Sequence, residues 1–143
     1  MKRFALSLLP LTCLLACTAT VATTPPVTIA TNVKDVQVRA FNTDNVGSIY
    51  LNNRLVVQAP KFQADTGLVD ITSELAAGSN TLQLQEVNTD GDWTYGFQVY
   101  VNGSLFFQSV CGNSSWPVGY VGCDNYDATL GVVYQQTLTL ITP

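Results

Sequence analysis

Alternating apolar and polar residues are the feature that most limits what this 143-residue chain can fold into. The alternation runs through Val36–Phe41, Leu82–Gln85 and Phe97–Val101. A period of two places successive side chains on opposite faces of a strand, so these segments predict half-buried β-strands. Helical patterns are scarce. Only Thr72 to Leu75 resembles a capped turn, which Gly78 would end.

Two turn signals join neighbouring predicted strands. Asn102-Gly103 lies between Gly96–Val101 and Leu105–Val110, and Asn-Gly is the strongest short signal for a β-hairpin. Asn52-Asn53 predicts a second hairpin, which joins Ser48–Leu51 to Leu55–Gln58. Both hairpins require antiparallel neighbours.

A long, Thr-rich strand is expected at the end of the chain, from Val132 to Ile141. With it, the pattern predicts eight to nine short strands and one helical turn. That content indicates an all-β fold, an antiparallel two-sheet β-sandwich formed by residues 33–143.

The N-terminal segment predicts export. Met1-Lys2-Arg3 is basic, and the apolar run from Phe4 to Ala16 is shorter than the roughly 20 residues that span a bilayer. Leu14-Leu15-Ala16-Cys17 resembles the bacterial lipobox, in which a small residue precedes a cysteine that receives lipid and becomes the mature N-terminus. We therefore expect residues 1–16 to be a lipoprotein signal peptide and Cys17 to be lipidated. The alternative is an ordinary signal peptide cleaved near Ala22.

The next segment, residues 17–32, is rich in Thr, contains Pro25-Pro26 and has little to bury. It is expected to be an extended tether; the alternative is that Val27 to Ala30 adds a first strand. Acyl chains hold a protein stably on a membrane. Thr18 follows Cys17 where an Asp would resemble an inner-membrane retention signal, so outer-membrane anchoring is expected. The alternative is a secreted or soluble periplasmic protein.

The cysteines fit an exported protein. With Cys13 lost in the signal peptide and Cys17 lipidated, Cys111 and Cys123 remain, and they are expected to form a disulfide in an oxidising compartment. The alternatives are two free thiols or half of a metal site. A zinc site is disfavoured because the chain has no His and no further Cys to complete it. No metal and no cofactor are predicted.

The charge excludes some partners. Processing at Cys17 removes Lys2 and Arg3, which leaves four basic residues against ten acidic ones and a net charge of −6. A chain this acidic is unsuited to nucleic acid and to anionic lipid surfaces.

The middle of the chain resembles galactose-binding-like jelly rolls. Asp44 to Leu55 is similar to their polar loop, strand and turn, and Val69 to Leu82 is similar to their Val-Asp-Ile-Thr segment with its following turn. Asn88, Trp93, Gly96 and Phe97, before a strand that ends in Asn102-Gly103, complete the resemblance. It implies a jelly-roll-like sandwich, in a superfamily whose members are often noncatalytic modules that bind sugars, lipids or proteins through loops. It assigns no sugar-contacting residue here.

Catalytic patterns are scarce. The chain lacks His, the Gly-x-Ser-x-Gly motif and a phosphate-binding Gly loop. Asp90 and Asp92 sit on one short loop, so cleavage of a glycosidic bond would need an opposed carboxylate such as Asp124 or Asp127. The prediction is that the protein is not an enzyme. The same Asn88-to-Asp92 loop is expected to be a polar turn, with a Ca²⁺ site as the alternative.

Aromatic residues gather in or beside the predicted loops, where their faces suit stacking on sugars while Asp90 and Asp92 bond hydroxyl groups. The candidate ligand-binding residues are Trp93, Tyr95, Trp116, Tyr120, Tyr126, Asp90 and Asp92. Alternatively, Trp93 and Tyr95 cover the end of the sandwich while Trp116 packs on the Cys111–Cys123 loop. The predicted function is a noncatalytic envelope lipoprotein that binds a glycan or another envelope component through loop residues. The alternative is a structural or assembly lipoprotein that binds a protein partner through a sheet face or an edge strand.

Overall fold

The structure is a computed structural model, and it describes residues 27–29, 32–60, 65–113, 119, 121–123 and 129–143. The predicted signal peptide of residues 1–16 and the predicted lipid-bearing Cys17 lie outside the described residues.

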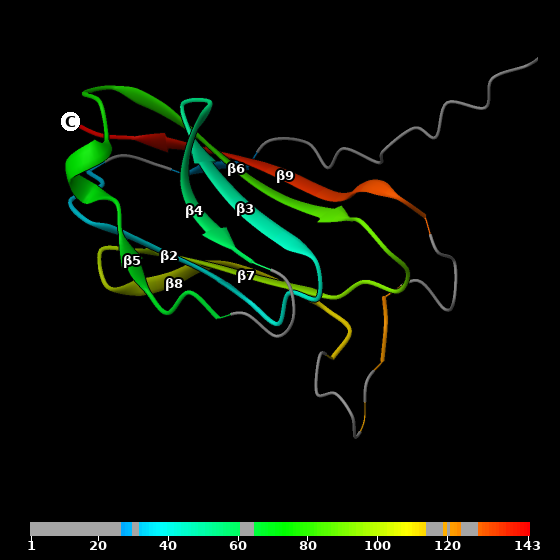
Figure 1. Cartoon of the computed structure of the whole chain (residues 1–143). Helices are drawn as coiled ribbons and strands as arrows, with labels where there is room; N and C mark the ends of the chain where they lie inside the picture. Colours follow the sequence, from blue (N-terminus) through cyan, green and yellow to red (C-terminus); the bar gives the residue numbers. More distant parts are fainter. Residues whose placement is uncertain (1–26, 30–31, 61–64, 114–118, 120, 124–128) are drawn as a thin grey trace, which may run out of the picture.

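Two β-sheets face each other, as Figure 1 shows. Sheet A has the strand order β1-β9-β6-β3-β4, and sheet B has the order β5-β2-β7-β8. The strands are β1 (Val27–Ile29), β2 (Val36–Phe41), β3 (Val46–Leu51), β4 (Arg54–Ala59), β5 (Val69–Asp70), β6 (Ser79–Asn88), β7 (Tyr95–Val101), β8 (Ser104–Cys111) and β9 (Gly131–Ile141). The predicted two-sheet β-sandwich is confirmed.

The chain passes repeatedly between the sheets, which makes the topology jelly-roll-like. Among the described strands, only β3–β4 and β7–β8 pair as sequence neighbours, whereas β2–β7, β3–β6 and β6–β9 pair strands that are distant in the chain. All the strand pairs are antiparallel except β1–β9, which is parallel. β1 lies within residues 17–32, where a tether was expected, and it matches the alternative that Val27 to Ala30 adds a first strand.

The two predicted hairpins are confirmed, and their turns show why these residues are needed. Asn102 and Gly103 have φ angles of 52° and 74°, and Asn52 and Asn53 have φ angles of 50° and 65°. Two successive residues in the left-handed region are the mark of the turn that best matches strand twist, and Asn and Gly adopt that region most readily.

The predicted helical turn is a single 3₁₀ turn, Thr72–Glu74, and it ends earlier than Gly78 because Leu75 is already extended. No side chain caps the turn from its N-cap residue, Ile71. Instead, Asp70 Oδ1 accepts a hydrogen bond from the Thr72 backbone at 2.9 Å, and Thr72 Oγ1 accepts one from the Val36 backbone at 2.9 Å. The turn is thus attached to the start of β2.

The apolar core fills most of the space between the sheets. Its fully buried members come from alternate positions of both sheets, as the period-two pattern predicts. They include Val36, Val38, Ile49, Leu51, Ile71, Leu82, Leu84, Phe97, Val99, Leu138 and Leu140. Near the end of β6 at Asn88 and the start of β7 at Tyr95, the inward side chains become polar and aromatic.

Candidate functional site

Several loops meet at one end of the sandwich, which we call the loop end: residues 42–45, 89–94, 112–113 and 121–123. Figure 1 shows this end opposite the turn at residues 102–103 and the C-terminus. Asn45 is fully buried there and connects two loops. Its Oδ1 accepts hydrogen bonds from the backbone N–H of Thr89 at 3.1 Å and from the Thr89 hydroxyl at 2.7 Å, while its Nδ2 donates to the Asp92 carbonyl at 3.3 Å.

A second set of hydrogen bonds ties the same loops to the end of β8. The buried Thr94 hydroxyl donates to the Asn42 carbonyl at 2.6 Å, and Asn42 Nδ2 donates to the Gly112 carbonyl at 3.1 Å. The Asp44 N–H donates to the Thr94 carbonyl at 3.3 Å. The loops are therefore fixed relative to one another by buried polar contacts rather than by apolar packing alone.

The Asn88-to-Asp92 loop is built as a polar turn. Asn88 is buried, and its Nδ2 donates to the carbonyls of Gly91 and Thr129, the latter at 2.8 Å, while its Oδ1 accepts from the Asp90 N–H at 3.3 Å. Gly91 has a φ of 131°, which favours glycine. Within the described residues no group of three or more His, Cys, Asp or Glu side chains is arranged to hold a metal ion.

The disulfide predicted between Cys111 and Cys123 is present, with the two Cα atoms 5.4 Å apart. Reciprocal backbone hydrogen bonds of 2.7 and 3.1 Å between Asn113 and Val121 narrow the loop inside it. The Cys123 N–H donates to the Trp93 carbonyl at 2.8 Å. The loop is thus attached at its base to the segment that carries the aromatic candidates.

Glycine is required at position 112, next to the disulfide. A Cβ atom there would lie 2.5 Å from the Val121 carbonyl oxygen and 2.7 Å from Thr94 Cγ2, and the residue has a φ of 70°. Backbone cannot yield as a flexible side chain can, so the close approach of these segments depends on Gly112.

The aromatic candidates Trp93 and Tyr95 form part of a row of stacked rings. The Trp93 and Tyr95 ring centroids are 6.0 Å apart with planes inclined by 6°, and Tyr95 and Tyr134 are 4.2 Å apart with planes inclined by 24°. Phe97 continues the row toward the core, 5.7 Å from Tyr134. Tyr95 thus lies between two rings and is half-buried at the end of the core. Trp93 ends the row and is also half-buried, and its Nε1 is buried without a hydrogen-bond partner among the described residues.

Sequence reasoning did not single out Tyr134. It occupies an inward position of β9 in step with Gln136, Leu138 and Leu140, so the strand periodicity contained the signal. Burial raises the pKa of both Tyr95 and Tyr134, although the Ser109 side chain, hydrogen-bonded to each, partly opposes the shift. Trp116, Tyr120 and Tyr126, the other aromatic candidates, lie outside the described residues.

Glu86 is the second residue that the sequence reading missed. It follows Leu82 and Leu84 on the inward face of β6 and is fully buried. Neither carboxyl oxygen has a hydrogen-bond partner of normal geometry among the described residues. Burial raises the pKa of Glu86 to about 8; the nearby Asn45 backbone lowers it, and the charge of Asp44 adds to the rise. The carboxyl is therefore mainly neutral at pH 7.

Space for this carboxyl comes from Gly47, its cross-strand neighbour on β3. A Cβ atom at Gly47 would lie 3.1 Å from Glu86 Oε2 and 2.5 Å from Thr43 Cγ2. Glu86 thus lies directly beneath the loop that carries Thr43 and Asn45.

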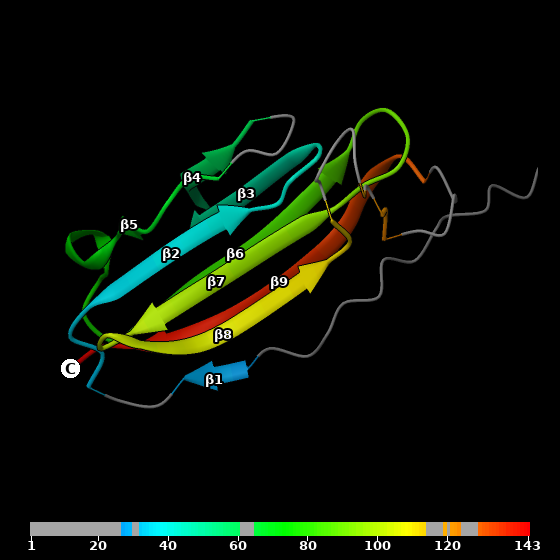
Figure 2. The same cartoon turned by 90° about the horizontal axis from the view of Figure 1, so that it is seen from below.

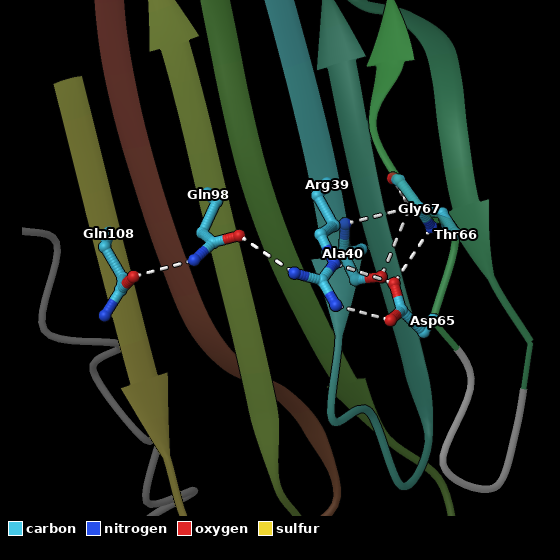
Figure 3. A network of polar contacts seen from close by, with 7 residues as sticks. All are labelled: Arg39, Ala40, Asp65, Thr66, Gly67, Gln98 and Gln108. Carbon is cyan, nitrogen blue, oxygen red and sulfur yellow. Dashed lines mark hydrogen bonds and ion pairs between the residues drawn. The ribbon is translucent and has the colours of Figure 1, made fainter. Parts of the chain in front are cut away.

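Polar side chains also cross the outer face of sheet B, as Figure 3 shows. Arg39 Nε donates to Asp65 Oδ1 at 2.8 Å and Arg39 Nη1 to Gln98 Oε1 at 3.3 Å, while Gln98 Nε2 donates to Gln108 Oε1 at 2.8 Å. The hydrogen bond from Arg39 lowers the pKa of Asp65 to about 2. We call this row, from Asp65 to Gln108, the polar ladder.

The charge at the loop end has one sign. Asp44, Asp90 and Asp92 belong to it, and the described part of this end contains no Lys or Arg. Such a surface disfavours anionic ligands and suits neutral ones. Besides these acidic residues, the loop end contains the Trp93–Tyr95–Tyr134 rings and, beneath its loops, the neutral buried carboxyl of Glu86.

No family model, no curated protein and no solved structure matches this chain. The resemblance to galactose-binding-like jelly rolls therefore stays a prediction, and the fold is established by the strand arrangement itself. Within the described residues, no helix is both long and apolar enough to cross a membrane.

Proposed function

We propose that this protein is a noncatalytic lipoprotein of the cell envelope, anchored through Cys17, whose loop end binds a neutral glycan or another envelope component. The single observation that carries the proposal is the construction of the loop end. A disulfide, a backbone bridge and three buried Asn and Thr side chains hold its loops beside the Trp93–Tyr95–Tyr134 row. Rigid aromatic surfaces bind with little loss of conformational entropy, which favours recognition.

Trp93 is the ring best placed to contact a ligand, because Tyr95 packs between Trp93 and Tyr134 whereas Trp93 lies at the end of the row. Aromatic faces stack on the apolar faces of sugar rings. The acidic loops supply carboxylate and backbone acceptors for hydroxyl groups, and the absence of basic side chains from the described part of this end disfavours charged sugars.

The test is a glycan array probed with the purified full-length protein, followed by calorimetry on any ligand found. Trp93→Ala combined with Trp116→Ala should abolish the binding, whereas Tyr100→Ala should leave it unchanged. Tyr100 is a matched control because it lies at the opposite end of β7, on the outer face of sheet B. Glycan binding that survives the double substitution would exclude the aromatic loop site.

A second candidate function is that of a structural or assembly lipoprotein with a protein partner. The observation that favours it is the exposure of apolar side chains along β8, where Leu105 is 49% exposed and Val110 47% exposed. Crosslinking in cells that recovers no protein partner, together with a clear affinity for a sugar, would decide against it.

A further inference from the structure

Strand β8 is an open edge of sheet B, and its pairing with β7 is regular from Phe107 to Cys111 but skips Phe106, which forms a β-bulge. It pairs with β7, and no other described strand lies beside it. Figure 2 shows it as the outermost strand of its sheet. Its eight residues include no charged residue and no proline, and Leu105, Phe106 and Val110 are 40% to 49% exposed. Edge strands of this kind readily pair with another strand.

The other sheet edges are managed differently. The three-residue β1 covers the outer side of β9, and the two-residue β5 covers β2. β4 begins at Arg54, which is ion-paired with Glu74, and it ends before Pro60. Short strands, charges, proline and β-bulges are the devices by which proteins prevent edge pairing, and β8 has only the last of these, at Phe106. Among the described edges, β8 alone combines length with an uncharged sequence.

The polar ladder ends at this edge. In Figure 3 the hydrogen bonds run from Arg39 through Gln98 to Gln108. Gln108 accepts with its Oε1, and its Nε2 has no partner among the described residues. A strand added beside β8 would therefore complete the ladder if it presented an acceptor at this level.

Gln108 of a second copy of β8 can supply that acceptor. Phe106, Gln108 and Val110 lie on one face, and the order is symmetric about Gln108. In an antiparallel pair of two β8 strands centred on Gln108, Gln108 faces Gln108, and Val110 faces the bulge residue Phe106 of the second copy. Residues directly opposite in an antiparallel pair lie on the same face, so all three contacts form together.

We propose that β8 pairs with β8 of a second copy of this chain, about a two-fold axis at Gln108, so that the two B sheets become one continuous sheet. Such a self-complementary contact is the usual form of a homodimer. The uncharged strand keeps the repulsion between two acidic chains away from the contact. A contact made along one edge strand is small, so a concentration-dependent dimer is expected. The inference is independent of glycan binding at the loop end.

The register makes a sharp crosslinking test possible. Cα atoms directly opposite in an antiparallel pair are about 4.5 to 5.5 Å apart, within the range of a disulfide. Mild oxidation of the purified full-length Gln108→Cys variant should therefore give a covalent dimer on a non-reducing gel. Leu55→Cys is the matched control, because Leu55 is 45% exposed on the edge strand β4. Equal dimer yields from the two variants, or no dimer from Gln108→Cys, would overturn the proposal.

A second measurement uses sedimentation of the full-length chain over a range of concentrations. Phe106→Lys with Val110→Lys places lysines opposite each other on both sides of the axis, and dimerisation should weaken by at least about tenfold. Leu55→Lys is the control and should leave the dimer unchanged. Both residues are exposed, so the thermal melt should show that the variant still folds. Unchanged self-association, or a wild-type protein that stays monomeric at every concentration, contradicts the inference.

Discussion

The fully buried Glu86 predicts a stability that falls as pH rises, and Glu86→Gln should remove that fall. The pKa of this carboxyl is near 4.5 in the unfolded chain and about 8 in the folded one. Because the folded pKa is the higher of the two, the unfolded state binds fewer protons throughout this range. Stability is therefore greatest below pH 4.5, declines as pH rises toward 8 and levels off above it.

The magnitude follows from the two pKa values. Within the window each pH unit removes up to about 1.4 kcal/mol, so wild-type stability should drop by roughly 2 to 3 kcal/mol between pH 5 and pH 7. At pH 7 the Gln variant should be more stable than wild type by about 3 kcal/mol, which corresponds to roughly 10 °C or more in Tm for a domain of this size. The Gln amide has nearly the same shape as the neutral carboxyl, so the substitution mainly removes the titration.

The assay is urea unfolding of both proteins at pH 5, 6, 7 and 8. Few other side chains titrate in this pH range. The chain has no histidine, the side chain that ordinarily titrates here. Glu74→Gln on the 3₁₀ turn is the matched control and should retain the wild-type slope, since Glu74 is exposed and ion-paired with Arg54. A wild-type stability that is flat or rising from pH 5 to pH 7, or a Glu86→Gln variant that keeps the slope, would refute the reasoning.

Three further predictions concern stability measured by thermal or urea unfolding. Gly47→Ala should destabilise by about 1–3 kcal/mol through its clash with Thr43, and Thr43→Ser, which removes the clashing methyl group, should recover part of the loss; equal effects with and without Thr43→Ser would contradict the contact. Replacing Cys111 and Cys123 together by Ala should lower stability by roughly 3 kcal/mol in the chain-entropy model, and a reducing agent should then have no further effect; an unchanged Tm would contradict it. Asn80→Ala should destabilise by about 1–3 kcal/mol, because the buried amide bonds the Ala76 backbone at 2.8 and 2.9 Å and Asn52 Nδ2 at 2.8 Å; a loss no larger than that of Ser79→Ala, at the exposed neighbouring position of β6, would argue against these contacts.

The strands and turns could be predicted because their signals are local. Alternation identified β2, β6 and β7, and the Asn-Gly and Asn-Asn pairs identified both hairpins, since each signal depends on residues only one or two positions apart. The disulfide was predictable from the cysteine count and an expected oxidising compartment. These features require no knowledge of which strands become neighbours.

The features that were missed depend on contacts between distant segments. A glutamate in an alternating strand can be buried only where Gly47, on another strand, leaves room for it. Tyr134 joins Trp93 and Tyr95 only because β9 lies across the sandwich from β7. The local pattern predicts a hairpin strand at Leu105–Val110, but it does not predict that this strand lies at the edge of sheet B with Leu105, Phe106 and Val110 exposed. Neighbour relations of this kind are set by the topology, which local patterns do not encode.

The inner place of β9 in sheet A has a consequence for the order of folding. This strand, Gly131–Ile141, lies between β1 and β6, so β1 has no partner and β6 has only β3 until the strand is in place. A chain that leaves the ribosome N-terminus first therefore cannot complete sheet A until residues 131–141 have been synthesised.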